Sequence, residues 1–355
     1  MAFFSVNNVA IRGISACVPP KVEENRDISF YTPEEAEQII KRTGIERKHI
    51  VEPGITNLDL CEKAFYALNE KLGWELDSID AVFYATQTED YITPPNVFVI
   101  HDRLNLPENC FALDIKHGCP GWVVGLSTIA SMISAGSIKR AIFFDGDNCT
   151  AINYKLDHEA RPLFGDCGTC TALEFDANAK PMDFHVGTVS KDGGALLRKY
   201  GRSRNPHTEE TFKRELDMLS GNVPINIENA DMDGASVFSF GISTVPKNLN
   251  KFLEHFNIAI NDIDKIVLHQ ANKFMLDKIA KKLGAKQEQV PSSLKNYGNT
   301  TSASIPLTIV SECGDEYASK MMNTIGYGFG TGLAWGSFHI ITEKIICPKV
   351  VVYNV

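Results

Sequence analysis

The chain has no apolar run that approaches the roughly 20 residues that a membrane-spanning helix requires. Its first eight residues also lack a basic stretch followed by an apolar segment, which is the pattern of a secretory signal peptide. Basic residues are too few for a general nucleic-acid-binding protein, since 35 Lys and Arg stand against 44 Asp and Glu and the formal net charge is −9. We therefore expect a cytoplasmic protein with no membrane partner and no nucleic-acid partner.

Cysteine is present, but not in a pattern that forms a disulfide framework. The nine cysteines are an odd number, scattered over 355 residues without a secretory signal. Cys167 and Cys170 form one C-x-x-C pair, and neither a second pair nor a histidine cluster follows to complete a zinc site. The sequence therefore predicts no metal centre, and we expect these two thiols to be small buried groups in a tight turn.

Strand-like and helical runs alternate along the chain, which is typical of a layered α/β fold. Helices are predicted to start at Thr32–Glu35, where a capping hydroxyl precedes Pro and two acids, and at Asn57. Residues 79–85 and 110–115 are predicted to be buried strands. The nearly all-apolar run 121–135 predicts a helix that is covered on most sides.

The chain contains a faint internal repeat. Residues 78–84 (SIDAVFY) resemble residues 262–268 (DIDKIVL), which lie 184 positions further along. The same offset places Cys119, at a strand-to-helix junction, on Ala303, where a second apolar helix begins. We therefore expect two similar α/β halves, residues 1–180 and 181–355.

Cys119 follows a strand and a sharp turn and directly precedes the apolar helix. A thiol at a helix N-terminus has a lowered pKa, because the positive end of the helix dipole favours the thiolate. Pro120 suits the first helical position, and Gly118 and Gly121 leave room for a substrate near the backbone. The alternative is an inert core cysteine, and the local sequence leaves both possibilities open.

Two further residues lie where active sites of α/β folds gather. His269 ends an apolar strand just before a helix, although a single histidine there can also be a structural residue. Asn299 also lies just before a helix, where it can serve as an N-cap, a role that does not exclude a catalytic one.

Alternating glycines in the run 326–332 (GYGFGTG) separate two strand-like segments. They allow a backbone N–H to point into a cavity, as an oxyanion hole requires. The run lacks G-K-[S/T] and a following helix, so it is a poor phosphate loop, and a simple glycine-rich hairpin is the alternative.

Together a cysteine, a histidine, an asparagine and a glycine-rich donor loop suit thioester chemistry. Papain-like proteases use the same three residue types in the same order, and the 150 positions between Cys119 and His269 fall at the edge of their usual spacing. Their cysteine, however, follows a C-G-S motif in a secreted, disulfide-bonded chain. This cysteine follows His117-Gly118 in a chain without a signal peptide, so the protease interpretation is disfavoured.

Six ordered motifs over nearly the whole chain resemble the thiolase superfamily and, within it, the beta-ketoacyl-acyl-carrier-protein synthase III family. The motifs are Arg42-Thr43-Gly44-Ile45, the junction at Cys119, residues 161–166 (RPLFGD), residues 269–272 (HQAN), residues 296–304 (NYGNTTSAS) and residues 328–332 (GFGTG). The resemblance implies a thiolase-like fold of two duplicated α/β halves in a five-layer αβαβα arrangement, normally as a homodimer.

The resemblance also implies a mechanism, a decarboxylating Claisen condensation that gives a 3-ketoacyl carrier product at the initiation of fatty-acid synthesis. Cys119 would become acylated, the backbone N–H groups of Cys119 and Thr331 would form the oxyanion hole, and His269 and Asn299 would stabilise the enolate released from a malonyl thioester. Phe164 would be a steric gate beside the nucleophile. Further substrate-binding positions would be Arg42, Gly330 and Gly332. The enzyme would be an acyltransferase without a cofactor that uses coenzyme A or phosphopantetheine thioesters as substrates.

The chain departs from the family pattern at several positions. Gly118 and Pro120 flank the cysteine where alanine or serine is usual, and His117 is unusual. Gln38 replaces an adenine-stacking tryptophan, which favours a carrier-bound donor over coenzyme A. Two prolines in residues 91–95 suggest a roomier acyl pocket, and the segment after residue 345 is longer than the family pattern.

An acyl carrier protein is the partner that the resemblance implies. Carrier proteins are acidic, so this acidic chain needs a local basic patch for docking. The predicted helix after His269 carries Lys273, Lys278, Lys281 and Lys282 for that role, with an ordinary solvated face as the alternative. Two other functions are weighed against the synthase: a related secondary-metabolism condensing or acyl-transfer enzyme with a non-malonyl or unusual carrier-bound substrate, and a silent scaffold subunit. The presence of Cys119, His269 and Asn299 together disfavours the scaffold.

Overall fold

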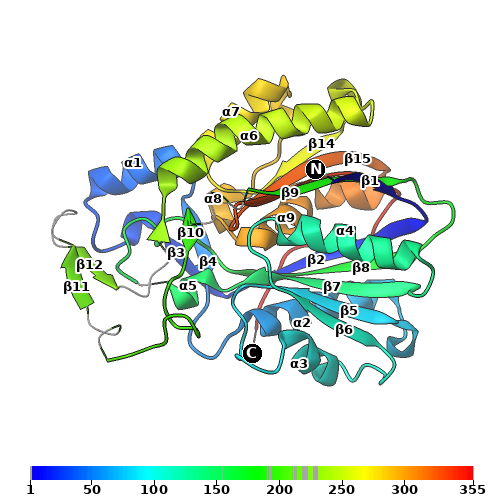
Figure 1. Ribbon diagram of the computed structural model, residues 1–355, viewed down its shortest axis with the longest axis horizontal. Coiled ribbons are helices and arrows are strands. Elements are labelled where there is room, and N and C mark those ends of the chain that lie inside the picture. The colour runs from blue at the N-terminus through cyan, green and yellow to red at the C-terminus, as the bar shows by residue number, and fades with distance from the viewer. Residues whose placement is uncertain are drawn as a thin grey trace.

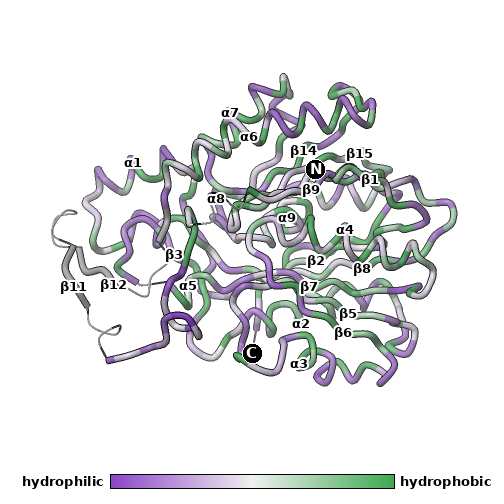
Figure 2. Tube along the Cα trace, in the orientation of Figure 1, coloured by the Kyte–Doolittle hydropathy of each residue, from purple (hydrophilic) through white to green (hydrophobic). Residues whose placement is uncertain are grey.

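A computed structural model shows five layers of alternating helices and sheets (Figure 1). The structure describes residues 2–354, apart from 154, 190, 192–193, 210, 212–213, 218–222 and 227–230. From one face to the other the layers are α6 and α7, a five-stranded sheet, α4 and α9, a six-stranded sheet, and α2 and α3. The hydrophobic trace is densest in the two sheets and the helices between them (Figure 2). The thiolase-like fold class is confirmed.

The two sheets contain most of the described strands. The first has the order β17-β2-β8-β7-β5-β6, with bounds Val351–Val352, Val9–Val18, Cys167–Phe175, Arg140–Asp147, Ala81–Ala85 and Phe111–Ile115. The second has the order β1-β9-β16-β15-β14, with bounds Ala2–Val6, Met182–Thr188, Ala334–Thr342, Met322–Gly330 and Lys265–Leu268. Three small two-stranded sheets pair β3 (Lys21–Glu24) with β4 (Arg47–Ile50), β10 (Leu196–Leu197) with β13 (Asp231–Met232), and β11 (Arg214–Asp217) with β12 (Val223–Asn226).

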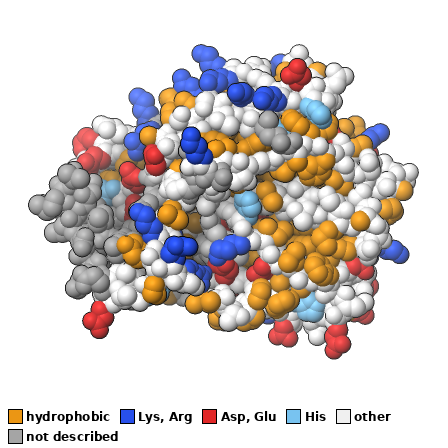
Figure 3. Space-filling view, viewed as in Figure 1, with side chains coloured by type: hydrophobic (Ala, Val, Ile, Leu, Met, Phe, Trp, Pro, Cys, Tyr) orange, Lys and Arg blue, Asp and Glu red, His pale blue; other side chains and the backbone are white. Residues whose placement is uncertain are grey.

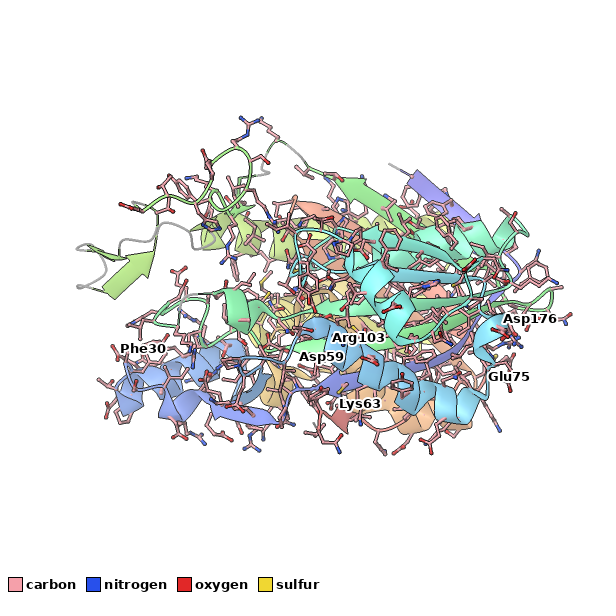
Figure 4. The ribbon with its side chains drawn as sticks, turned by 90° about the horizontal axis from the view of Figure 1, so that it is seen from below. Phe30, Asp59, Lys63, Glu75, Arg103 and Asp176 are labelled. Carbon is pink, nitrogen blue, oxygen red and sulfur yellow. The ribbon has the colours of Figure 1, made fainter. Side chains whose placement is uncertain are left out.

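The helices lie between and outside these sheets. Their bounds are α1 Pro33–Thr43, α2 Asn57–Leu72, α3 Asn96–Arg103, α4 Gly121–Ser134, α5 Cys149–Ile152, α6 Gly234–His255, α7 Lys273–Leu283, α8 Leu294–Tyr297 and α9 Ser304–Ser319. The predicted starts of α1 and α2 are confirmed, and Thr32 and Thr56 each close a capping box at these two N-termini. On the outer face, Asp59 of α2 and Arg103 of α3 form an ion pair (Figure 4).

The internal repeat is visible in the pairing of the strands. In both sheets a parallel pair, β5–β7 or β14–β15, is continued by two antiparallel partners. Asp80, just before β5, accepts a hydrogen bond from the backbone N–H of Arg140, and Asp264, just before β14, accepts the same bond from Asn323. The offset of 184 positions therefore joins structurally equivalent residues.

The chain passes from the first sheet to the second between β8 and β9. Each terminus is nevertheless added to the sheet of the other half, because β1 pairs with β9 and β17 pairs with β2. The long C-terminal segment thus covers the edge of β2. The domain division at residue 180 stays a prediction.

The helix α4 lies between the sheets and is mostly buried, as predicted, with Trp122 fully inaccessible. Two other predictions are wrong, one about burial and one about a turn. The strand β6 is an exposed edge, with Phe111 44% and Leu113 40% exposed, because no described strand covers it. Cys167 and Cys170 are buried, but they belong to β8 rather than to a tight turn, since their neighbours pair with β2 and β7 on both sides.

Candidate active site

Cys119 lies between the end of β6 and the start of α4, the helix that Figure 1 shows between the two sheets. Its side chain is 9% exposed. It packs against Gly330 of β15 so closely that a Cβ placed on that glycine would lie 2.7 Å from the sulfur. The backbone N–H groups of Thr331 and of Cys119 itself both face the thiol. The turn after β15 therefore supplies one donor and the nucleophile's own backbone supplies the other, as an oxyanion hole requires.

The resting thiol is protonated, contrary to the expectation from the helix terminus. Burial, and then the charge of Asp147, raises the pKa of Cys119 to about 12, and the two backbone N–H groups offset only part of this increase. The expectation was wrong because it considered only the local helix, whereas burial between the two sheets and the charge of Asp147 on β7, which is distant in sequence, act on the sulfur more strongly.

His269 follows β14 and is 2% exposed. Its Nδ1 lies 2.8 Å from the hydroxyl oxygen of Ser304, and that oxygen also accepts the backbone N–H of Gln270 at 3.3 Å. We assign the Ser304 hydroxyl as donor to Nδ1, which leaves the imidazole proton on Nε2. Burial lowers the pKa of His269 to about 4, so the ring is a neutral donor at physiological pH. Its ring contacts Phe329, the residue before Gly330, with centroids 5.5 Å apart.

Asn299 is 7% exposed and held at both backbone and side chain. Its backbone N–H donates to Leu163 and its carbonyl accepts from Gly165, so the segment around Phe164 lies alongside it. The carboxamide oxygen accepts the backbone N–H of Thr301 at 2.9 Å, which leaves the NH₂ group as the donor. The N-cap interpretation is wrong, because α9 begins at Ser304 and its N-cap is Ala303.

Contacts therefore link the three predicted residues. The sulfur of Cys119 touches Gly330, whose neighbour Phe329 touches His269. Thr301 donates to Asn299, and its backbone carbonyl faces the His269 ring. A sulfur, an imidazole and a carboxamide from distant parts of the sequence are thus connected through a short series of buried neighbours.

The sequence did not identify the residues that hold this assembly together. Thr301 adopts a left-handed conformation with φ of 52°, and its hydroxyl donates to Asp147 at 2.6 Å. Asp145 lies two positions earlier on β7 and is also fully buried. The sequence signal that could have found Asp145 and Asp147 is a pair of acids at the end of an otherwise apolar strand. A buried carboxylate is costly unless it is paired or hydrogen-bonded, so acids at such a place indicate a specific contact.

For the other predicted positions, the structure gives their surroundings. Phe164 lines a small pocket together with Thr150, Asn153, Ala160 and Arg161. Arg42 is exposed in the last turn of α1, and no described contact joins it to the nucleophile. Gly332 has a φ of 134°, a conformation that favours glycine in the turn after Thr331.

Gly330→Ala is expected to abolish formation of an acyl-enzyme, because the new methyl group would occupy the position of the Cys119 sulfur. The measurement is the intact mass of the protein after incubation with an acyl thioester. Gly234→Ala, at the start of α6 where a Cβ meets no atom within 4 Å and φ is not positive, is the control for a glycine substitution. Normal acylation of the Gly330 variant would show that this contact is not part of the site.

In the part of the chain that the structure describes, no three His, Cys, Asp or Glu side chains are grouped to hold a metal ion. Over the same residues, no helix combines the length and the apolar character needed to cross a membrane.

Comparisons with known proteins agree with this geometry. Residues 113–190 match the model of 3-oxoacyl-[acyl-carrier-protein] synthase III, and residues 253–341 match the model of its C-terminal part. The chain is 32% identical to the beta-ketoacyl-[acyl-carrier-protein] synthase III of Lactococcus lactis subsp. cremoris strain MG1363, over 90% of this chain and 95% of that one. The chain belongs to the beta-ketoacyl-acyl-carrier-protein synthase III family.

Further synthase III proteins are similar in sequence and in structure. The synthase III of Clostridium perfringens strain ATCC 13124 is 31% identical over 94% of this chain and 98% of its own. The crystal structure of a 3-oxoacyl-(acyl-carrier protein) synthase from Burkholderia xenovorans LB400 superimposes with a TM-score of 0.92 and 31% identity, and covers 99% of both chains. The two matched segments contain Cys119 in the first and His269, Asn299 and Thr331 in the second.

Proposed function

We propose that this chain catalyses the decarboxylating condensation of an acyl thioester with malonyl-acyl-carrier-protein to give a 3-ketoacyl-acyl-carrier-protein. The observation that carries the proposal is the assembly of Cys119, His269 and Asn299 around the two backbone donors. The relatives are named as synthases of this kind, and their names give no support to the alternative of a non-malonyl acceptor.

In the first half-reaction the sulfur of Cys119 attacks the carbonyl carbon of the acyl thioester. The oxyanion that forms accepts hydrogen bonds from the backbone N–H groups of Cys119 and Thr331. The donor's thiol leaves with the proton of Cys119, and an acyl-cysteine remains. Because the thiol has a pKa of about 12, the proton must be removed as the new bond forms rather than beforehand.

In the second half-reaction the malonyl thioester loses CO₂ and becomes an enolate. His269, neutral because its pKa is about 4, donates through Nε2, and Asn299 donates through its NH₂ group to the enolate oxygen. The enolate carbon attacks the acyl-cysteine, a C–C bond forms, and Cys119 leaves as a thiolate that recovers a proton. Loss of CO₂ supplies the carbanion, so two oriented donors can replace a strong base.

The experiment that tests this function incubates the purified protein with an acyl thioester and malonyl-carrier and measures CO₂ and 3-ketoacyl product together. The proposal expects the two in equal amounts. Acylation of the protein without any CO₂ release would instead support the alternative enzyme with another acceptor. The experiment is run with the acyl donor as a coenzyme A thioester and again as a phosphopantetheine thioester, because the identity of the donor carrier is itself a proposal.

An acyl carrier protein is the proposed partner, and α7 is its proposed docking site. Basic side chains gather over α6 and α7 on the outer layer (Figure 3). Lys282 donates to the carbonyl of Ile242 on α6, and Lys273 pairs with Asp277, so these two lysines also stabilise the surface itself. Lys278 lies over the ring of Phe274, 5.1 Å from its centroid, and Lys281 is exposed one turn later.

The double variant Lys278→Glu and Lys281→Glu is expected to raise the KM for malonyl-carrier by about tenfold, with kcat little changed, because charge complementarity acts on encounter. Steady-state kinetics at low salt measure this effect. Lys349→Glu, on the far C-terminal segment, is the control for one charge reversal. An unchanged KM for the carrier would place docking elsewhere.

We propose that the protein forms a homodimer through the exposed edge of β6. A free edge that carries Phe111 and Leu113 is a template for pairing, and it continues into exposed Phe98 on α3 and Ile92, which is 85% exposed. A cytoplasmic location also stays a prediction.

Leu113→Glu is expected to convert the dimer to monomers, because a charge would be buried without a partner between two copies. Light scattering after size-exclusion chromatography gives the mass of each species. Val352→Glu is the matched control, because Val352 lies in β17 at the opposite edge of the same sheet and is 51% exposed. A Leu113 variant that remains dimeric would contradict this interface.

A further inference from the structure

The strand β7 ends in two acids that lie beneath the candidate active site. Asp145 and Asp147 are 0% and 1% exposed. Because they are two positions apart on a strand, both side chains point to the same face of the sheet. That face meets the segment Thr301–Ala303, which connects Asn299 with α9. The reaction steps proposed above use neither carboxyl group.

Asp147 is surrounded by hydrogen-bond donors. One oxygen accepts from the hydroxyls of Thr86 and Thr88 and from the backbone N–H of Gln87. The other oxygen accepts from the Gln87 amide at 3.1 Å and from the Thr301 hydroxyl at 2.6 Å. A carboxylate with five donors is well compensated inside a protein, although burial still raises the pKa of Asp147.

Thr301 connects the Asp147 carboxylate with Asn299 and His269. Its backbone N–H holds the carboxamide oxygen of Asn299, and its carbonyl faces the ring of His269. Its left-handed backbone, unusual for a β-branched residue, needs an external contact to fix it, and the bond to Asp147 is that contact.

Asp145 has the opposite environment. Neither of its oxygens accepts a hydrogen bond of good geometry, although the hydroxyl of Ser302 faces the carboxyl group closely enough to lower its pKa in part. A Cβ placed on Gly121, the first residue of α4, would lie 3.6 Å from an oxygen of Asp145 and 3.1 Å from the Cβ of Ser302. Asp145 therefore lies where α4, the helix that follows Cys119, meets the segment Thr301–Ala303 of the second half.

The Ser302 hydroxyl compensates a charge on Asp145 only in part. On β7 the neighbouring ionisable group is Asp147, which is also acidic. Burial, together with this charge, outweighs the Ser302 hydroxyl and raises the pKa of Asp145 well above its usual range. The turn before α4 contains Cys119 and His117. The Cβ of His117 lies 3.6 Å from a Cβ placed on Gly121. Its Nδ1 has no hydrogen-bond partner, and burial lowers its pKa. Among the described residues, the Ser302 hydroxyl is the donor that faces an ionised Asp145, whereas Asp147 accepts from five donors. Asp145 is therefore the less compensated of the two carboxyl groups, and in its protonated form it can donate to Ser302.

We propose that the two acids are positioning residues that act in different protonation states. Asp147 acts as a carboxylate that orients Thr301 and, through it, Asn299 and His269. Asp145 acts as a neutral carboxylic acid that joins Ser302 to the first turn of α4. Two neighbouring carboxyl groups differ in protonation when their environments move their pKa values apart.

Alkylation of Cys119 by iodoacetamide tests the protonation states without any substrate. Asp147→Asn removes a charge that raises the pKa of the thiol, so alkylation at pH 8 is expected to be about tenfold faster than in wild type, as one pKa unit implies. Asp145→Asn replaces one neutral group by another, so its rate is expected to stay within twofold of wild type. Equal acceleration by both variants, or none by Asp147→Asn, would overturn the proposal.

Turnover tests the positioning role, and this part rests on the proposed function. Relative to wild type, kcat is expected to fall about 100-fold in Asp147→Asn, as a displaced catalytic group implies, with KM changed less than threefold. The amide of Asp145→Asn can still donate to Ser302, so this variant is expected to retain much more activity than Asp145→Leu. If Asp147→Asn does not fold, Thr301→Val replaces it in the test, because this variant lacks the hydroxyl that donates to Asp147 but keeps the Asp147 carboxylate. Thr301→Val should lower kcat and leave the rate of Cys119 alkylation unchanged. Similar kcat losses in Asp145→Asn and Asp145→Leu would contradict the neutral-donor role.

Discussion

Cys119→Ala is expected to lower condensation activity by at least about 10³-fold and to abolish the mass increase after incubation with any acyl thioester. The acyl group is held on this sulfur, and the remaining donors cannot substitute for a covalent intermediate. Intact-protein mass spectrometry and product formation measure the two effects. Cys347→Ala, in the C-terminal segment, controls for removal of a thiol that is not at the site.

An acyl adduct that persists in Cys119→Ala would place the nucleophile on another residue. The structure makes this a strict test, because burial raises the pKa of the described cysteines that surround the site, including Cys149, Cys61 and Cys167. None of these three is placed between two backbone N–H donors as Cys119 is.

The second large effect separates the two half-reactions. His269→Ala and Asn299→Ala are each expected to retain acylation of Cys119 and to lose CO₂ release from malonyl-carrier by about 10²- to 10³-fold. Each change removes one of two donors to the enolate oxygen, and the loss of a single such donor has this magnitude. Acylation is measured by mass, and decarboxylation by release of labelled CO₂.

His101→Ala, on α3 at the opposite outer face, controls for loss of an imidazole. Acylation and decarboxylation that fall equally in the His269 variant would show that the ring acts on the nucleophile instead. Its low pKa, about 4, argues against that role, since a poor base cannot deprotonate a thiol with a pKa of about 12.

Local patterns were enough to locate the chemical groups of the site. Cys119 was identified by its place between a strand and a helix, and His269 by its place at the end of an apolar strand; the structure confirms both placements. The internal repeat predicted two similar halves because an offset of 184 residues keeps the same turn and strand in register.

Long-range packing decided what the sequence could not show. The thiol's pKa is raised first by burial and then by Asp147, which approaches from β7, so the helix terminus alone gave the wrong sign. The strand β6 contains an apolar run like a buried strand, but its position at the sheet edge exposes Phe111 and Leu113. The sequence pattern assigned no role to Thr301, because its role comes from contacts with Asp147 and Asn299.

One chase experiment tests the whole account. The protein is first acylated, and its intact mass is recorded; malonyl-carrier is then added without further acyl donor. Within one turnover the mass is predicted to return to that of the free protein, with one CO₂ and one 3-ketoacyl-carrier released per acyl group lost. An acyl-enzyme that survives the addition of malonyl-carrier, or that loses its acyl group without releasing CO₂, would contradict the condensation mechanism.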